Sequence, residues 1–117
     1  MSVKLILFVK RRSDLTHEQF KARYESGHAP LARRSLPLLR RYVRNFLSPV
    51  PGGPEPAYDC VTEFWFDSQA DLDATMAWGR GAEGQDILGR DEAEFMDRSS
   101  MVTFIAAEVS LPGEPLP

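Results

Sequence analysis

The chain has 117 residues, two histidines, one cysteine and a formal net charge of −3. This length fits one domain over residues 1–117, and the slightly acidic balance gives no general affinity for nucleic acid. A single cysteine excludes an intrachain disulfide and is typical of the cytoplasm. No apolar run approaches the roughly 20 residues of a membrane span, and the histidines and cysteine are too scattered for a zinc site. We therefore expect a cytoplasmic protein with no metal and with neither a nucleic acid nor a membrane as partner.

The start of the chain predicts a strand followed by a helix. Residues 3–11 are rich in Val, Leu, Ile and Phe, and this segment is short enough for a buried strand. Thr16 followed by Gln19 predicts a capping box, in which each side chain satisfies a free amide of the first helical turn. A helix is therefore expected to begin near His17.

This helix is expected to falter near Gly27, because Pro30 has no amide hydrogen to donate to the carbonyl of Ser26. Residues 28–35 then form a kinked continuation or a second short turn. The remaining elements are strands at 39–47, 58–66 and 101–109, helices after Ser68 and over 85–97, a Pro- and Gly-rich loop at 48–57 and a surface tail at 112–117.

The order of elements is strand, helix, strand, strand, helix, strand. It predicts an α+β, ferredoxin-like βαββαβ fold, with an antiparallel four-stranded sheet and helices on one face. In the last strand, apolar residues such as Phe104 and Ile105 alternate onto both faces. One chain has helices for only one face, so a second copy packed sheet against sheet is expected, which makes a homodimer.

His28 shares a helix face with Phe20, Tyr24 and Leu31 at helical spacing. Histidine takes and gives protons near neutrality, so an inward His28 beside a helix break is a candidate acid/base group in a pocket. Two interpretations stay open, since a core histidine with its ring nitrogens satisfied by the backbone has the same spacing.

Two segments resemble the EthD family, which belongs to the dimeric α+β barrel superfamily. The first comprises the opening strand with Leu15, Thr16, Glu18, Phe20, Tyr24, His28, Pro30 and Leu31, and the second comprises Asp59, Glu63, Trp65, Phe66, Asp67 and Ser68. The resemblance spans roughly residues 3–108. It implies a dimeric α+β barrel whose pocket lies between the helices and the sheet.

Comparison with cyclases of this fold implies that Cys60, Thr62 and Phe64 face the helices, while Glu63 and Trp65 face the other way. Cys60 stands where those enzymes carry a pocket histidine, and a methylmuconolactone isomerase that resembles the chain at His28 carries its cysteine at the position of Phe64. The mechanism of neither enzyme can therefore be assigned unchanged to this chain. The expected substrate-binding residues are Cys60, Thr62, Phe64, Trp78, Leu5 and Leu7.

Each candidate has a structural alternative. Tyr24 donates a hydrogen bond to a substrate oxygen or packs in the core, and Trp78 closes a pocket or packs. Cys60 is more typical of a small buried apolar residue than of a nucleophile. Glu63 is interpreted as structural, with Arg44 or Lys10 as its partner. The arginines at 33, 34, 40, 41 and 44 form a basic patch that binds carboxylates or is simply a solvated face.

The resemblance implies a cofactor-independent enzyme for acid/base chemistry (cyclisation, dehydration or isomerisation) on a small cyclic carbonyl, aromatic or polyketide-like molecule. His28 and Tyr24 are its expected catalytic residues. Two alternatives remain: a cofactor-free, anthrone-type monooxygenase, and a non-enzymatic EthD-like accessory or binding protein. A haem role has only the one inward histidine in its favour.

Overall fold

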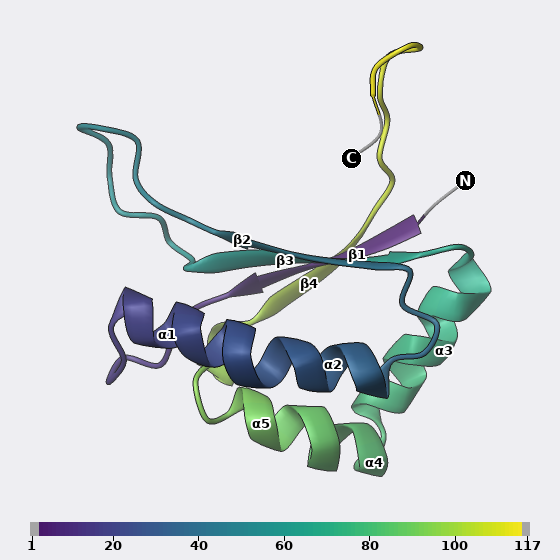
Figure 1. Cartoon of the computed structure of the whole chain (residues 1–117), viewed down its shortest axis with the longest axis horizontal. Helices are drawn as coiled ribbons and strands as arrows, with labels where there is room; N and C mark the ends of the chain where they lie inside the picture. Colours follow the sequence, from purple (N-terminus) through teal and green to yellow (C-terminus); the bar gives the residue numbers. More distant parts are fainter. Residues whose placement is uncertain (1–2, 116–117) are drawn as a thin grey trace.

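A computed structural model describes residues 3–115 of the chain as one layer of helices packed under one antiparallel sheet (Figure 1). The elements are β1 (Val3–Val9), α1 (His17–Arg23), the π-helical turn η1 (Tyr24–His28), α2 (Ala29–Ser35), β2 (Arg41–Phe46), β3 (Cys60–Phe66), α3 (Gln69–Arg80), α4 (Ala82–Gly84), the π-helical turn η2 (Gln85–Gly89), α5 (Arg90–Glu92), the 3-10 turn η3 (Arg98–Ser100) and β4 (Val102–Ala106). No helix within residues 3–115 is both long and apolar enough to span a bilayer.

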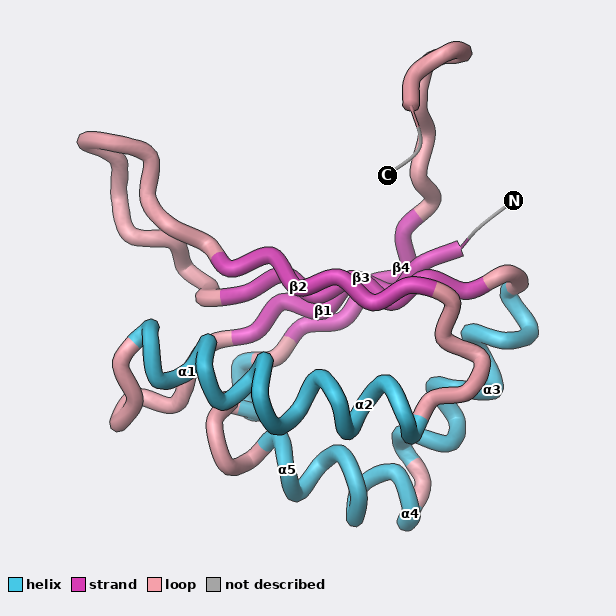
Figure 2. The backbone as a smooth tube through the Cα atoms, viewed as in Figure 1, coloured by secondary structure: helices cyan, strands magenta, loops and turns pink. Residues whose placement is uncertain are grey.

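The sheet has four strands in the order β2-β3-β1-β4, and each neighbouring pair is antiparallel. All helices lie on one side of it, as the ribbon and the backbone tube both show (Figures 1 and 2). The predicted ferredoxin-like βαββαβ fold is confirmed. Strands β3 and β1 are central, so side chains on their helix-facing side define the middle of the molecule.

Both predicted helix starts are confirmed by their caps. The Thr16 side chain accepts a hydrogen bond from the backbone amide of Gln19, and the Gln19 side chain accepts one from the amide of Thr16. At α3, the Ser68 hydroxyl accepts from the amide of Asp71 at 3.1 Å. These short polar side chains satisfy amides that have no partner within the first turn.

The predicted interruption near Gly27 is confirmed in part, because the α-helix gives way to a π-helical turn there, but the helix does not end and continues through Pro30 to Ser35. The chain widens into the π-helical turn η1, in which the amide of Ala29 donates to the carbonyl of Tyr24. Pro30 then stands in the first turn of α2, where a missing amide hydrogen costs little. The continuous rod α1–η1–α2 places His28 at its middle rather than at a helix end.

The second helical unit is shorter and more interrupted than predicted. α3 ends at Arg80 with Gly81 as its C-cap, and the segment expected as a helix over 85–97 is helical only to Glu92. Gly84 is required at the corner, because a Cβ there would lie 2.2 Å from the carbonyl oxygen of Trp78. After this corner η2 and α5 run beside the α1–η1–α2 rod (Figure 1).

The core between sheet and helices divides into two apolar clusters. The first joins Phe20 and Tyr24 of the rod to Val9, Cys60 and Phe95. The buried residues of the second cluster are Ala32, Leu36, Leu39, Phe66, Leu72 and Leu88. Tyr42 and Phe64 pack against both clusters, so the two residues occupy the boundary between them.

The opposite face of the sheet carries no helix. The loop between β2 and β3 and the segment after β4 both extend on this uncovered side (Figure 2). Phe104 on β4 leaves 57% of its surface exposed and contacts Phe8 edge-on, with ring centroids 6.0 Å apart. The predicted tail at 112–117 follows β4 as exposed chain, and its residues 116–117 lie outside the described part.

Candidate functional site

His28 lies under the sheet at the end of η1, with only 3% of its surface exposed. Its Nδ1 is 2.8 Å from a carboxylate oxygen of Asp91 on α5, a residue 63 positions further along the chain. A carboxylate only accepts hydrogen bonds, so Nδ1 carries the proton and donates it. The other ring nitrogen, Nε2, is then an unprotonated base.

Arg23 holds Asp91 from the other side, because its Nη2 donates to the second carboxylate oxygen. Gly27 permits this contact. A Cβ at that position would stand 2.3 Å from Nη1 of Arg23, on the path that the guanidinium takes across the helix surface. Arg23 also lies 5.2 Å from the ring centre of Phe95, so its side chain is packed as well as paired.

The charge states of the pair follow from these contacts. Burial lowers the pKa of His28, and the hydrogen bond that His28 donates to Asp91 opposes this shift without reversing it. Burial acts to raise the pKa of Asp91, but the hydrogen bonds from Arg23 and His28 outweigh it and the pKa is lowered. At neutral pH the site therefore holds a neutral imidazole oriented by an ionised carboxylate.

Glu92 is the second acidic group of the site. Its Oε2 lies 3.9 Å from Nε2 of His28, and its Oε1 lies 3.4 Å from Nε of Arg98. Burial raises the pKa of Glu92 to about 7, with Arg98 acting against the shift. A base and a partly protonated acid thus stand side by side at neutral pH, which is an arrangement that can move a proton in either direction.

Tyr24 is fully buried, and its hydroxyl lies 2.6 Å from that of Thr62 on β3. Burial raises the pKa of Tyr24 well above its ordinary value, so this phenol stays protonated. The thiol of Cys60 extends this row of hydrogen-bonded side chains, with Sγ 3.6 Å from the Thr62 hydroxyl. Burial raises the pKa of the Cys60 thiol to about 11, and a thiol in that state is a poor nucleophile.

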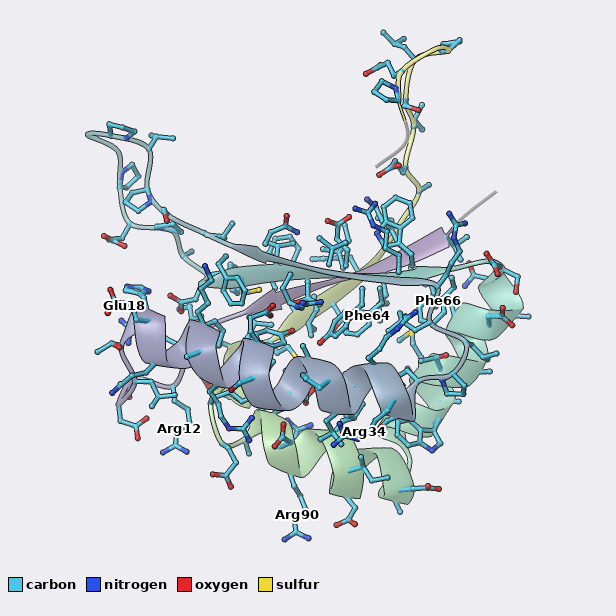
Figure 3. All side chains as sticks on the ribbon, in the orientation of Figure 1. Arg12, Glu18, Arg34, Phe64, Phe66 and Arg90 are labelled. Carbon is cyan, nitrogen blue, oxygen red and sulfur yellow. The ribbon has the colours of Figure 1, made fainter. Side chains whose placement is uncertain are left out.

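The predicted orientation of β3 is correct, since Cys60, Thr62 and Phe66 are buried in the helix-facing core. Figure 3 shows Phe64 and Phe66 on the helix side of the strand. Phe64 and its register partner Leu5 are only partly buried, however, whereas Thr62 and its partner Leu7 are buried. The helix layer therefore covers the centre of the sheet less tightly around Phe64 than around Thr62.

The predicted catalytic residues His28 and Tyr24 line neither of two hollows on the surface. Trp78 lines a cavity of about 390 Å³ with Leu36, Pro37 and Ile87, and this cavity lacks both His28 and Tyr24. An open groove of about 1190 Å³ runs past Arg11, Asp59 and other charged residues, also without them. Within residues 3–115, no three His, Cys, Asp or Glu side chains converge as metal ligands would.

The predicted partners of Glu63 are wrong. Its carboxylate accepts from Lys4 at 2.8 Å and from Asn45 at 3.0 Å, on the uncovered face of the sheet. Arg44 points to the other face, where it pairs with Glu25. The reason is strand alternation: Arg44 is the register partner of Thr62, which faces the helices.

Asp91, Glu92 and Arg23 are the site residues that sequence reasoning missed. Adjacent carboxylates directly after the glycine-interrupted segment at 79–89 were the available signal. Spacing along one helix cannot show that this pair meets His28, because the contact joins two helices that are distant in sequence.

The fold and this site define a class: ferredoxin-like α+β domains with a helix-borne histidine beneath the sheet. The profile of the EthD domain matches residues 12–99, which is most of the chain, and the chain belongs to the EthD family. No curated protein sequence matches it.

Solved structures of several proteins share the fold of this chain. An EthD family protein of Bacillus halodurans is 28% identical, with a TM-score of 0.71, over 93% of this chain and 100% of that one. A hydroxynitrile lyase of Passiflora edulis is 14% identical, with a TM-score of 0.65, over 95% and 97%. SnoaB, a cofactor-independent oxygenase of Streptomyces nogalater, is 11% identical, with a TM-score of 0.59, over 97% and 98%. The last two likenesses show the fold alone.

Proposed function

We propose that this protein is a cofactor-independent enzyme that moves a proton on a small cyclic carbonyl or aromatic molecule, in a cyclisation, dehydration or isomerisation. The observation that supports this best is the His28 ring, fixed at Nδ1 by Asp91 and facing Glu92 through Nε2. Nε2 of His28 faces a carboxyl group 3.9 Å away, beyond hydrogen-bond distance, whereas a histidine that served only the core would have both ring nitrogens hydrogen-bonded. It would not need a second acid whose pKa is raised to about 7.

In this mechanism the neutral Nε2 of His28 removes a proton from a carbon next to the substrate carbonyl. Asp91 keeps the ring in the correct tautomer and stabilises the imidazolium that forms. Glu92, protonated in part at neutral pH, returns a proton to the product oxygen or leaving group. Every group that exchanges a proton with the substrate is a side chain of this protein.

Tyr24 is the proposed donor to the substrate oxygen, because its raised pKa keeps the phenol protonated. The substrate ring is proposed to enter the less tightly covered region at Leu5 and Phe64 and to contact Leu7, Thr62 and Cys60 beyond it. Trp78 lines a separate cavity, so its part is limited to the outer end of such a pocket.

The test is turnover of a panel of aromatic ketones and lactones by the wild-type protein and by His28→Ala. We expect turnover to fall roughly 100-fold or more, since a positioned general base contributes about that much. His17→Ala is the matched control, because His17 is the other histidine and its side chain is largely exposed. Full activity of His28→Ala on a substrate that the wild type converts would disprove the proposal.

A cofactor-free oxygenase is the second candidate, favoured by the likeness in fold to SnoaB. It would use the same base to form a carbanion that reacts with molecular oxygen. An oxygen electrode during turnover separates the two, since proton transfer alone consumes none. A non-enzymatic accessory protein is the third, and it predicts that His28→Ala changes stability while ligand affinity stays the same.

We propose further that the protein is a cytoplasmic homodimer that closes a dimeric α+β barrel, with no nucleic acid or membrane partner. The support is the uncovered face of the sheet, where Phe8, Tyr58 and Phe104 form an aromatic row. A second copy packed on this face would remove that row from water.

A further inference from the structure

Four of the chain's arginines line one groove of about 470 Å³ beside the sheet edge. The groove lies between the start of α2 and strand β2, which is a terminal strand of the sheet. Its lining residues include Pro30, Tyr42 and Arg33, Arg40, Arg41 and Arg44, with Glu25 as the one carboxylate. This concentration of positive charge stands out in a chain whose formal net charge is −3.

Within the groove, a carboxylate of the chain itself already forms a bidentate ion pair with an arginine. Glu25 accepts from Nε of Arg44 at 2.7 Å and from Nη2 of Arg44 at 2.8 Å. A third nitrogen of Arg44 donates to the carbonyl of Tyr42 at 2.9 Å, so the guanidinium is fixed before any ligand arrives. Side-by-side contact of this kind is the geometry in which arginine recognises carboxylates.

Glu25 is the more exposed member of this ion pair. Its side chain is 38% exposed, whereas that of Arg44 is 20% exposed. Arg33 is fixed by a 2.8 Å hydrogen bond to the carbonyl of Leu39, and Arg40 contacts Asp67 only at 3.4 Å. The guanidinium of Arg41 lies over Trp65 on the other face of the sheet. It therefore adds positive charge near the groove but does not contact a ligand inside it.

Apolar surface lies at the floor of the same groove. The ring of Tyr42 stacks on Phe64 at 5.0 Å with an interplanar angle of 20°, and the guanidinium of Arg44 lies 4.5 Å from the ring centre of Tyr42. An aromatic acid would present a ring to Pro30 and Tyr42 and a carboxylate to the arginines.

We propose that this groove is a binding site for small aromatic carboxylates, with Arg44 and Arg33 as the anion ligands and Glu25 as an internal competitor. The site is distinct from the His28 site, because His28 turns toward α5 while Arg44 and Glu25 face the edge of β2. The proposal therefore stands whether or not His28 acts as a base.

Calorimetric titration with sodium benzoate tests the proposal, with benzamide as the neutral probe of similar shape. Glu25→Gln removes the internal carboxylate and is expected to tighten benzoate binding roughly tenfold or more. Adding Arg44→Gln to that variant is expected to weaken binding roughly tenfold or more, without leaving an unpaired charge behind. Benzamide is expected not to bind.

Arg34→Gln is the matched control, because Arg34 follows Arg33 on α2, is exposed and does not line the groove (Figure 3). It is expected to leave benzoate affinity unchanged. The two proposals fail separately, because neither Glu25 nor Arg44 has a part in the proposed proton transfer at His28. The proposal is overturned if Glu25→Gln protein does not bind benzoate, if benzamide binds equally well, or if Arg34→Gln weakens binding as much as Arg44→Gln. Stronger binding of inorganic phosphate than of benzoate would overturn the carboxylate assignment.

Discussion

The two faces of the sheet differ in how completely their side chains are buried. On the helix-facing side, Tyr24 and Thr62 satisfy each other's hydroxyls inside a closed core. On the uncovered side, Phe104 stays largely exposed and the charged group of Lys4, Glu63 and Glu108 lies among apolar neighbours. The first face is complete within one chain, and the second carries apolar surface that one chain does not cover.

The two faces also differ in the polar and ionisable groups that they carry. The covered face holds the hydrogen-bonded hydroxyls of Tyr24 and Thr62, and the helices that cover it carry His28, Asp91 and Glu92. The uncovered face has no such cluster of a histidine with two carboxylates within residues 3–115. Chemistry is therefore expected on the covered side and assembly on the other.

The largest expected effect is on assembly. Phe104→Asp places a charge on the uncovered face, on the edge strand β4, and is expected to weaken dimerisation at least about 100-fold, since buried aromatic anchors contribute about 2–4 kcal/mol. Light scattering after size-exclusion chromatography measures it. Ile105→Asp is the matched control, because Ile105 is equally exposed but is the register partner of Leu5 on the other face. Equal loss of dimer in both variants would contradict the assignment of the faces.

A smaller effect is expected inside the covered face. Thr62→Val keeps the volume but leaves the buried Tyr24 hydroxyl without its partner, which is expected to lower the free energy of unfolding by about 1–3 kcal/mol. Thr103→Val, on an exposed position of β4, is expected to change it by less than about 0.5 kcal/mol. Urea unfolding compares the two. A Thr62→Val protein as stable as the wild type would mean that Tyr24 finds another partner.

The smallest expected effect depends on pH. The pKa of Glu92 is about 7 in the folded chain against an ordinary value of 4.5, so its favourable contribution is complete below pH 4.5 and is lost as the pH rises through 7. Glu92→Gln is therefore expected to be more stable than the wild type at pH 8, by less than the roughly 3 kcal/mol of the full pKa shift because glutamine also loses the ion pair with Arg98, and equally stable at pH 4. Glu94→Gln, an exposed neighbour, is the control. Equal stability of the Glu92→Gln and wild-type proteins at pH 8 would show that Glu92 is not held by burial.

Local signals in the sequence predicted the local structure well. Thr16 with Gln19 and Ser68 with Asp71 act within one helical turn, and the alternation on β3 depends only on the strand period. Proline at position 30 gave a partly correct signal: its missing amide predicts an interruption of the α-helix, and the structure has one, but a wider π-helical turn just before it keeps the helix continuous.

The site was less predictable because its contacts are between elements. His28 could be singled out from helical spacing, but its partners Asp91 and Glu92 meet it only after two helices pack under the sheet. The placement of Arg44 on the helix-facing side needed the register of β2 against β3, which the sequence of β2 alone does not set.

The central claim is that His28 is a neutral base oriented by Asp91, and NMR titration of its ring tests this most directly. The spectra are expected to show the proton on Nδ1 and a pKa below 6.5, lowered further in Asp91→Asn because that change removes a charge that favours the imidazolium. Addition of aromatic ketones or lactones is expected to shift the Nε2 signal. A ring that carries its proton on Nε2, or that ignores both the Asp91→Asn change and every added compound, would contradict the account.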